Sequence, residues 1–201
     1  VRYGALIAGL ELIDARAYAT DDAPLDTGLV DTLDVLRAHA GLRLEGVLAE
    51  GDVLTLAAGR MTLDVGSRRL VARNEFRNTI NAFTGLDVTW ERDERSLRAF
   101  AVTPVRRLPS EPEAVADNAW ELDRERTDAL LWGALGALPL GHEVRVEGYA
   151  IGLHERDGGG ATATARQLVT PGFRALRAPA PARLDLELEA FLSLTAEPKT
   201  F

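Results

Sequence analysis

The fold class is decided by one stretch, Arg183-Leu184-Asp185-Leu186-Glu187-Leu188-Glu189-Ala190-Phe191-Leu192. Its even positions are apolar, and its odd positions from 183 to 189 are charged. A period of two places the apolar side chains on one face of a β-strand and the charged side chains on the other. The same alternation recurs in residues 35–45, 86–92 and 143–152. The sequence therefore predicts an all-β chain.

We predict nine strands, bounded by turn residues and polar connections. Short connections such as Glu50-Gly51-Asp52 alternate along much of the chain with long polar ones, such as residues 66–82 and 109–127. Short turns on one rim and long loops on the other are typical of outer-membrane barrels. The predicted strands cover residues 3–19, 35–48, 53–65, 83–92, 97–108, 128–138, 143–155, 167–177 and 183–194.

The composition of the apolar face favours a barrel over a sandwich. This face consists mainly of Leu, Ala, Val and Gly. Small residues fill a sandwich interior poorly, whereas lipid chains conform to any apolar wall. We therefore predict an antiparallel up-and-down transmembrane β-barrel, with residues 1–201 in a single domain. Aromatic residues are few for a barrel with two aromatic girdles. Two alternatives therefore stay open: a soluble β-sandwich that binds carbohydrate or cleaves it as a lyase, and a structural β-domain of a surface assembly.

Composition and motifs also exclude several function classes. The 201 residues include 31 acidic and 23 basic residues, and a net charge of −8 argues against a nucleic-acid partner. The chain has no cysteine, and its three histidines, His39, His142 and His154, lack metal-ligand spacing. We find no nucleophile elbow, phosphate loop or dinucleotide motif. We therefore expect no enzyme activity, no cofactor and no metal.

One segment is unusually rich in arginine. Residues 58–83 contain only two acids, Asp64 and Glu75, and five arginines: Arg60, Arg68, Arg69, Arg73 and Arg77. The two parallel N–H donors of a guanidinium group match the two oxygens of a carboxylate. These arginines could therefore pair with acids of neighbouring strands, or form a selective ring for an anionic solute. The strand pattern places Met61, Leu63 and Val65 on the face opposite Arg60.

The same segment resembles the central motif of the alginate export family, outer-membrane β-barrel proteins of Gram-negative bacteria. The resemblance rests on Gly59-Arg60, Gly66-Ser67-Arg68-Arg69-Leu70, Arg77-Asn78-Thr79 and Phe83-Thr84-Gly85, in that order. Residues 99–105 are similar to the next strand of the family, and residues 179–189 to a later hairpin.

The resemblance implies a porin-like channel in the outer membrane that passively transports an anionic polysaccharide or another anionic solute. It implies about eighteen strands, within the range of such barrels, so the nine predicted here are expected to be part of a larger barrel. The implied surroundings are outer-membrane lipid and periplasmic export partners. The arginine cluster would lie near the pore constriction. Arg37, Arg43 and Arg145 would line the wall with Glu45, Glu147 and Glu187.

Overall fold

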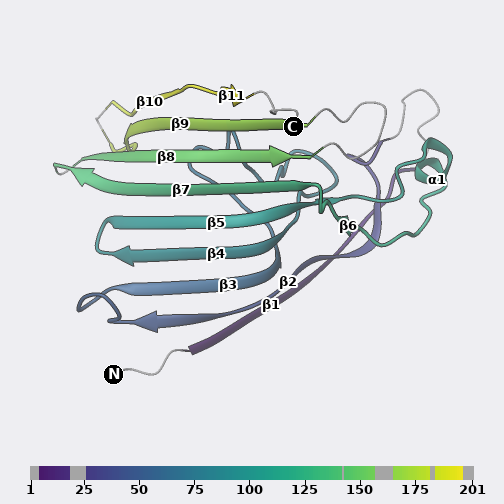
Figure 1. The fold of residues 1–201 in the computed structure, drawn as a ribbon, viewed down its shortest axis with the longest axis horizontal. Coiled ribbons are helices and arrows are strands. Elements are labelled where there is room, and N and C mark those ends of the chain that lie inside the picture. The colour runs from purple at the N-terminus through teal and green to yellow at the C-terminus, as the bar shows by residue number, and fades with distance from the viewer. Residues whose placement is uncertain (1–4, 19–25, 142, 157–164, 182–183, 197–201) are drawn as a thin grey trace.

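The computed structural model describes residues 5–18, 26–141, 143–156, 165–181 and 184–196. These residues form one 11-stranded antiparallel sheet, and its neighbouring strands follow the order β1-β2-β3-β4-β5-β7-β8-β9-β10 (Figure 1). The short strand β6 pairs with β5, and β11 pairs with β9. The sheet is an up-and-down meander that does not close on itself, as a part of a barrel wall would be.

β1 to β5 and β7 to β9 have 9–15 residues each and are long enough to cross a bilayer, which requires about 9–11 residues per tilted strand. A five-residue helix, α1 (Pro112–Ala116), lies in the connection between β5 and β7. The strands are β1 (Ala5–Ala15), β2 (Asp31–Glu45), β3 (Val53–Met61), β4 (Phe83–Arg92), β5 (Arg95–Arg106), β6 (Arg124–Glu125), β7 (Ala129–Leu140), β8 (Val144–Glu155), β9 (Arg166–Arg177), β10 (Leu186–Phe191) and β11 (Leu194–Ala196).

The predicted meander is confirmed, with shifts at several strand ends. The prediction for β4 agrees at both ends, whereas β2 begins at Asp31 instead of Val35. β3 ends at Met61, so the predicted continuation to Val65 is wrong. The helix α1 and the strand β6 were not predicted, and the predicted strand 183–194 is divided into β10 and β11. The ends of the first and last predicted strands at residues 3, 19 and 183, and His142, lie outside the described residues.

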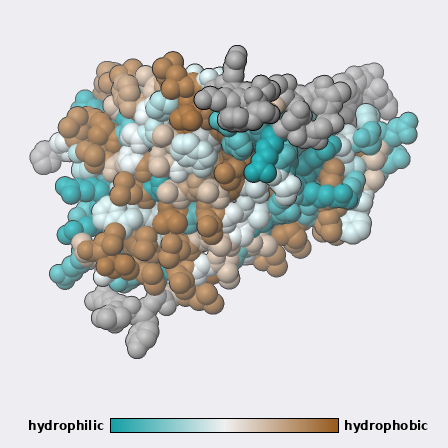
Figure 2. Space-filling model, in the orientation of Figure 1, coloured by the Kyte–Doolittle hydropathy of each residue, from teal (hydrophilic) through white to brown (hydrophobic). Residues whose placement is uncertain are grey.

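One face of the sheet, the outer face, is apolar and exposed. The β4–β5 register places Leu86 opposite Ala101 and Trp90 opposite Leu97, and Leu86 and Leu97 are largely exposed. Figure 2 shows apolar side chains spread over the strands of this face, with polar side chains gathered near its ends. All described strands belong to one sheet, so the second layer that a sandwich requires is not found among them. None of the described helices is long and apolar enough to cross a membrane.

The tight turns and the long connections lie at opposite ends of the sheet. β4 and β5 are joined by Asp93 and Glu94, whereas β3 and β4 are joined by residues 62–82. The β2–β3 turn is held by buried Asp52, whose carboxylate accepts hydrogen bonds from the backbone N–H groups of Val47, Leu48 and Ala49 at 2.9–3.0 Å. The predicted alternation of short and long connections is confirmed.

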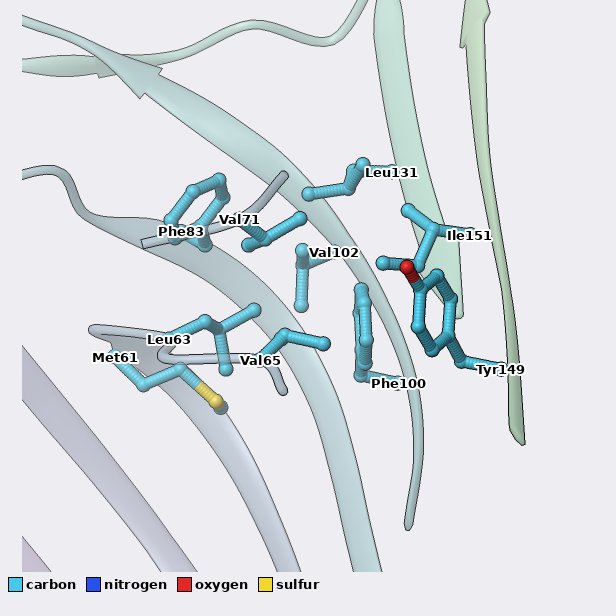
Figure 3. Packing of buried hydrophobic residues seen from close by; sticks show 10 residues of the cluster. All are labelled: Met61, Leu63, Val65, Val71, Phe83, Phe100, Val102, Leu131, Tyr149 and Ile151. Atoms are coloured by element: carbon cyan, nitrogen blue, oxygen red, sulfur yellow. The ribbon is translucent and has the colours of Figure 1, made fainter. Parts of the chain in front are cut away.

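The other face, the inner face, is partly covered by the long β3–β4 connection. A buried cluster joins β3, β4, β5, β7 and β8 to this connection (Figure 3). Its sheet residues include Phe83, Phe100, Val102, Leu131 and Ile151. The core of the structure is thus a chain segment packed on one face of a sheet, and the inner face is not wholly ionic as the alternation had suggested.

Candidate functional site

Residues 62–82, here called the inward segment, connect β3 to β4 and fold back across the inner face. The segment makes a narrow turn in which the N–H of Arg68 donates to the carbonyl of Val65 at 2.9 Å, and the N–H of Val65 donates to the carbonyl of Val71 at 3.1 Å. Arg68 and Asn74 adopt positive φ angles of 65° and 66° in its turns. These bonds give the segment a defined backbone course.

Apolar side chains attach the first part of the inward segment to the sheet. Leu63 is 1% exposed and lies with Val65 and Val71 against Phe100 and Val102 (Figure 3). The prediction that Leu63 and Val65 continue a strand is therefore wrong. The prediction that they share an apolar side with Met61 is confirmed. Burial of such side chains stabilises the docked position by about 1.5–3 kcal/mol for each large aliphatic group.

Polar contacts attach the tip of the segment to a distant strand. Glu189 of β10, whose side chain is 4% exposed, accepts hydrogen bonds at Oε1 from Ser67 Oγ and from Tyr149 Oη, both at 2.9 Å. The guanidinium Nε of Arg69 lies 3.2 Å from the other carboxylate oxygen of Glu189. The segment that leaves β3 therefore reaches β10, and it crosses the inner face between them.

Further bonds hold the start and rear of the segment. Arg98 of β5 pairs with Asp87 of β4 at 2.8 Å and donates to the backbone carbonyl of Asp64 at 2.6 Å. At the rear, Asn78 Nδ2 donates to the carbonyl of Leu29 at 2.7 Å, and Thr79 Oγ1 donates to the carbonyl of Thr27 at 3.0 Å. The segment is thus fixed at its start, tip and rear.

The arginines predicted from the sequence fall into two groups. Arg68 and Arg69 lie at the tip of the segment, and their side chains are 58% and 65% exposed. Arg68 lies 3.9 Å from Asp64 and 3.8 Å from Glu75, and Arg73 lies 3.2 Å from Glu75. Arg77 is also exposed. These four arginines share one inward segment, on which Arg68, Arg69 and Arg77 are exposed and Arg73 is half-buried.

Arg60 belongs to the second group, because it is enclosed by bonds. Its side chain is 14% exposed and pairs with Asp34 at 3.2 Å and with Glu125 at 3.0 Å. It also donates to the backbone carbonyls of Val35 and Asp123. Arg60 therefore joins the start of β2 to β6, and the structure does not bring its guanidinium group together with those of the segment tip.

The inner wall beyond the segment carries paired charges. Arg145 lies 3.2 Å from Glu147, and Arg174 bridges Glu147 and Glu187 at 3.2 Å and 3.0 Å. Of the other two predicted wall arginines, Arg37 lies 3.4 Å from Glu11, and Arg43 is exposed on β2. Sequence reasoning missed Arg98, Tyr149, Arg174 and Glu189 as partners of the segment and wall; the charged row at positions 185–189 was a signal for Glu189 alone.

A comparison with models of protein families matches the chain to the family described as alginate export, over residues 4–193. No curated protein and no solved structure matches the chain. The family is one of transport proteins of the outer membrane, not of enzymes. The match covers nearly all of the sequence, including every strand of the sheet from β1 to β10 and the whole inward segment. The chain therefore belongs to the alginate export family.

Proposed function

We propose that this chain forms part of the wall of an outer-membrane channel that passively exports an anionic polysaccharide or another anionic solute. The observation that carries the proposal is the inward segment, which lies on the inner face and holds the exposed side chains of Arg68 and Arg69. A loop that folds inside a pore narrows it, and the charge on that loop then selects the solute. Family membership supports the same class of function.

The pairing of Arg68 suits weak, sequential contact with carboxylates. Arg68 lies 3.8–3.9 Å from its acidic partners, and such exposed pairs contribute little stability. A polymer carboxylate can therefore replace the protein carboxylate at little cost, and the next carboxylate of the polymer can replace it in turn. We assign contact with the solute to Arg68, Arg69, Arg73 and Arg77. We assign Arg60 the positioning of β2 and β6 behind them.

The two faces of the sheet suit a bilayer on one side and water on the other. The outer face would contact outer-membrane lipid in a Gram-negative cell, with the tight turns toward the periplasm and the long connections outside. Arg37, Arg43 and Arg145 would line the aqueous wall. An open sheet edge leaves backbone groups unpaired in lipid, so further strands would close the wall. Periplasmic export partners would deliver the polymer to the turn side.

Charge reversal at the segment tip tests this function. We expect the double variant R68E/R69E of the full chain, in planar lipid bilayers under a salt gradient, to shift the reversal potential toward cation preference. The physical reason is that four units of charge change beside the narrowest part of the pore. The shift should shrink as salt rises, because the Debye length falls from about 10 Å at 0.1 M to about 3 Å at 1 M.

The matched control is R92E/R95E, which makes the same change in charge at the tight β4–β5 turn. We expect this control to leave the reversal potential nearly unchanged, since the turn lies at the far end of the sheet from the β3–β4 connection. An unchanged potential in R68E/R69E, or an equal shift in both variants, would contradict the assigned role of the segment.

A further inference from the structure

Three aspartates that are far apart in the sequence meet at the end of the sheet that carries the long connections. Asp31 and Asp34 lie among the first four residues of β2, and Asp123 immediately precedes β6. One carboxylate oxygen of each lies within 4.8 Å of the others. Figure 1 shows β6 and α1 gathered near the start of β2, where hydrogen bonds also join Asn118 to Ala17 and Trp120 to Leu33. This aspartate cluster stands apart from the inward segment tip.

Asp31 is the member whose environment is least satisfied. The residue is 2% exposed, and within the described part of the chain its Oδ1 has no hydrogen-bond partner. A buried carboxylate without a donor carries a large desolvation penalty, which a proton or a cation must offset. This unpartnered oxygen belongs to Asp31, whose carboxylate lies close to those of Asp34 and Asp123. A missing positive partner at this position is the simplest physical account.

The remaining oxygens are held in fixed positions. Asp34 accepts a hydrogen bond from Arg60 Nη1 at 3.2 Å, and its Oδ2 accepts one from the backbone N–H of Asp123 at 2.5 Å. Asp123 Oδ1 accepts from the backbone N–H of Leu108 at 2.7 Å. These bonds orient two of the three carboxylates and leave the second oxygen of Asp123 for another partner. The cluster is therefore preorganised by the backbone N–H groups of two separate segments and by the guanidinium group of Arg60.

The nearby guanidinium groups do not balance the negative charge. Arg60 divides its charge between Asp34 and Glu125. Arg107 donates to the carbonyl of Thr27 and to Asn81 Oδ1, and among the described residues it makes no ion pair within 4.0 Å with the three aspartates, so it offsets their charge only from a distance. The site thus holds more carboxylate charge than its protein partners neutralise.

We propose that Asp31, Asp34 and Asp123 bind a hard divalent cation, of which Ca²⁺ is the best fit. Oxygen ligands from carboxylates are the donors that Ca²⁺ and Mg²⁺ take in proteins. Two oxygens on opposite sides of one Ca²⁺ lie about 4.6–5.2 Å apart, since each Ca–O distance is about 2.3–2.6 Å. The spacing within the cluster is compatible with this span. The bound cation would tie β2 to the connection before β6 and brace the rim that carries the long loops.

The sequence does not reveal this site, because Asp123 lies far from Asp31 and Asp34 in the chain. Nothing in the spacing of residues 31, 34 and 123 marks them as a set. This proposal does not depend on the proposed transport function, because its test measures cation binding and involves no flow of solute.

The direct test uses Tb³⁺, a luminescent substitute for Ca²⁺, on the full chain in detergent. The indole N–H of Trp120 donates to the carbonyl of Leu33, the residue before Asp34, at 3.0 Å, so this ring lies beside the cluster and can sensitise a bound Tb³⁺. We expect indole-excited luminescence that Ca²⁺ removes at lower concentration than Mg²⁺. We also expect Ca²⁺ to raise the thermal unfolding midpoint, because a ligand that binds only the folded state stabilises it.

Two variants make the result specific to the cluster. D31N should remove both the luminescence and the Ca²⁺-dependent rise in the midpoint, while its midpoint without Ca²⁺ should equal or exceed that of the wild type, because an unpaired buried charge is gone. E113Q, an exposed acid of α1 at the same end of the sheet, should behave as the wild type. Absence of both signals in the wild type, or equal signals in D31N, would overturn the proposal. If D31N does not fold, the wild-type titration still decides it.

Discussion

Docking of the inward segment onto the sheet should depend on Leu63. The substitution Leu63→Ala removes most of a side chain that is 1% exposed and packs among Val65, Phe100 and Val102. The backbone of the sheet cannot collapse into the space left behind, because the strands are fixed by their ladders of hydrogen bonds. We therefore expect Leu63→Ala to weaken the docked state of the segment while the sheet remains intact.

The magnitude follows from the burial. Truncation of a buried leucine to alanine costs about 2–5 kcal/mol, which includes the cavity that remains. Because about 1.4 kcal/mol corresponds to a tenfold change in an equilibrium constant, the population of undocked segment should rise by roughly 30-fold or more. The contact between Arg69 and Glu189 at the tip cannot offset this loss, because it lies outside the cavity and does not fill it.

Trypsin measures this change directly, because the segment carries the adjacent arginines Arg68 and Arg69. Cleavage there follows the undocked population when opening and closing are faster than cleavage. We expect Leu63→Ala to raise the cleavage rate by roughly 30-fold or more, with noisier single-channel current in bilayers. The control is Phe76→Ala in the same segment, whose side chain is fully exposed. Equal cleavage rates in the two variants would refute anchoring by burial.

Two further substitutions test other contacts. Gly172→Ala would place a Cβ 2.4 Å from the ring of Tyr149, so the ring must move and its bond to Glu189 should break; we expect faster trypsin cleavage of the segment than in Gly148→Ala, whose added Cβ meets nothing within 4 Å. Asp52→Ala should lower the unfolding midpoint at pH 7, since the β2–β3 turn loses its acceptor. The hydrogen bond from the Trp90 indole, followed by bonds from the turn backbone, lowers the pKa of Asp52, so this contribution is present above the unfolded pKa of about 3.9 and is lost as the pH falls through the folded value. Below pH 4, the thermal unfolding midpoint of the wild type should therefore drop by more than that of Asp52→Ala. Equal drops in the two proteins would contradict the second prediction.

The period-two pattern predicts the sheet well where both faces alternate. Leu86, Val88 and Trp90 alternate with polar residues between clear boundaries, and β4 matches the prediction at both ends. The pattern fails after Met61, because Leu63 and Val65 keep the alternation after the chain has left the sheet. Alternation reports which side of the chain is apolar. It does not report whether the backbone hydrogen bonds go to a neighbouring strand.

The residues of the candidate site could be predicted from the sequence, but their long-range partners could not. The sequence identified the arginines of the inward segment, since so many basic residues with few acids are visible in one stretch. It could not pair Ser67 with Glu189, which is 122 positions away. It also could not separate Arg60, enclosed between Asp34 and Glu125, from the exposed Arg68. Long-range pairs of this kind depend on the order of strands across the sheet, which local periodicity does not contain.

The central claim, that the outer face contacts lipid while the inner face contacts water, is tested most directly by single spin labels on cysteines. The chain has no cysteine of its own, so each label is unique. We choose Leu97 and Leu188 on the outer face and the paired Thr55 and Thr89 on the inner face. In reconstituted full-length protein, labels at the leucine positions should collide with oxygen dissolved in the lipid, and labels at the threonine positions with a water-soluble nickel chelate. Equal nickel accessibility at all four positions, or leucine positions shielded from both reagents, would contradict the account.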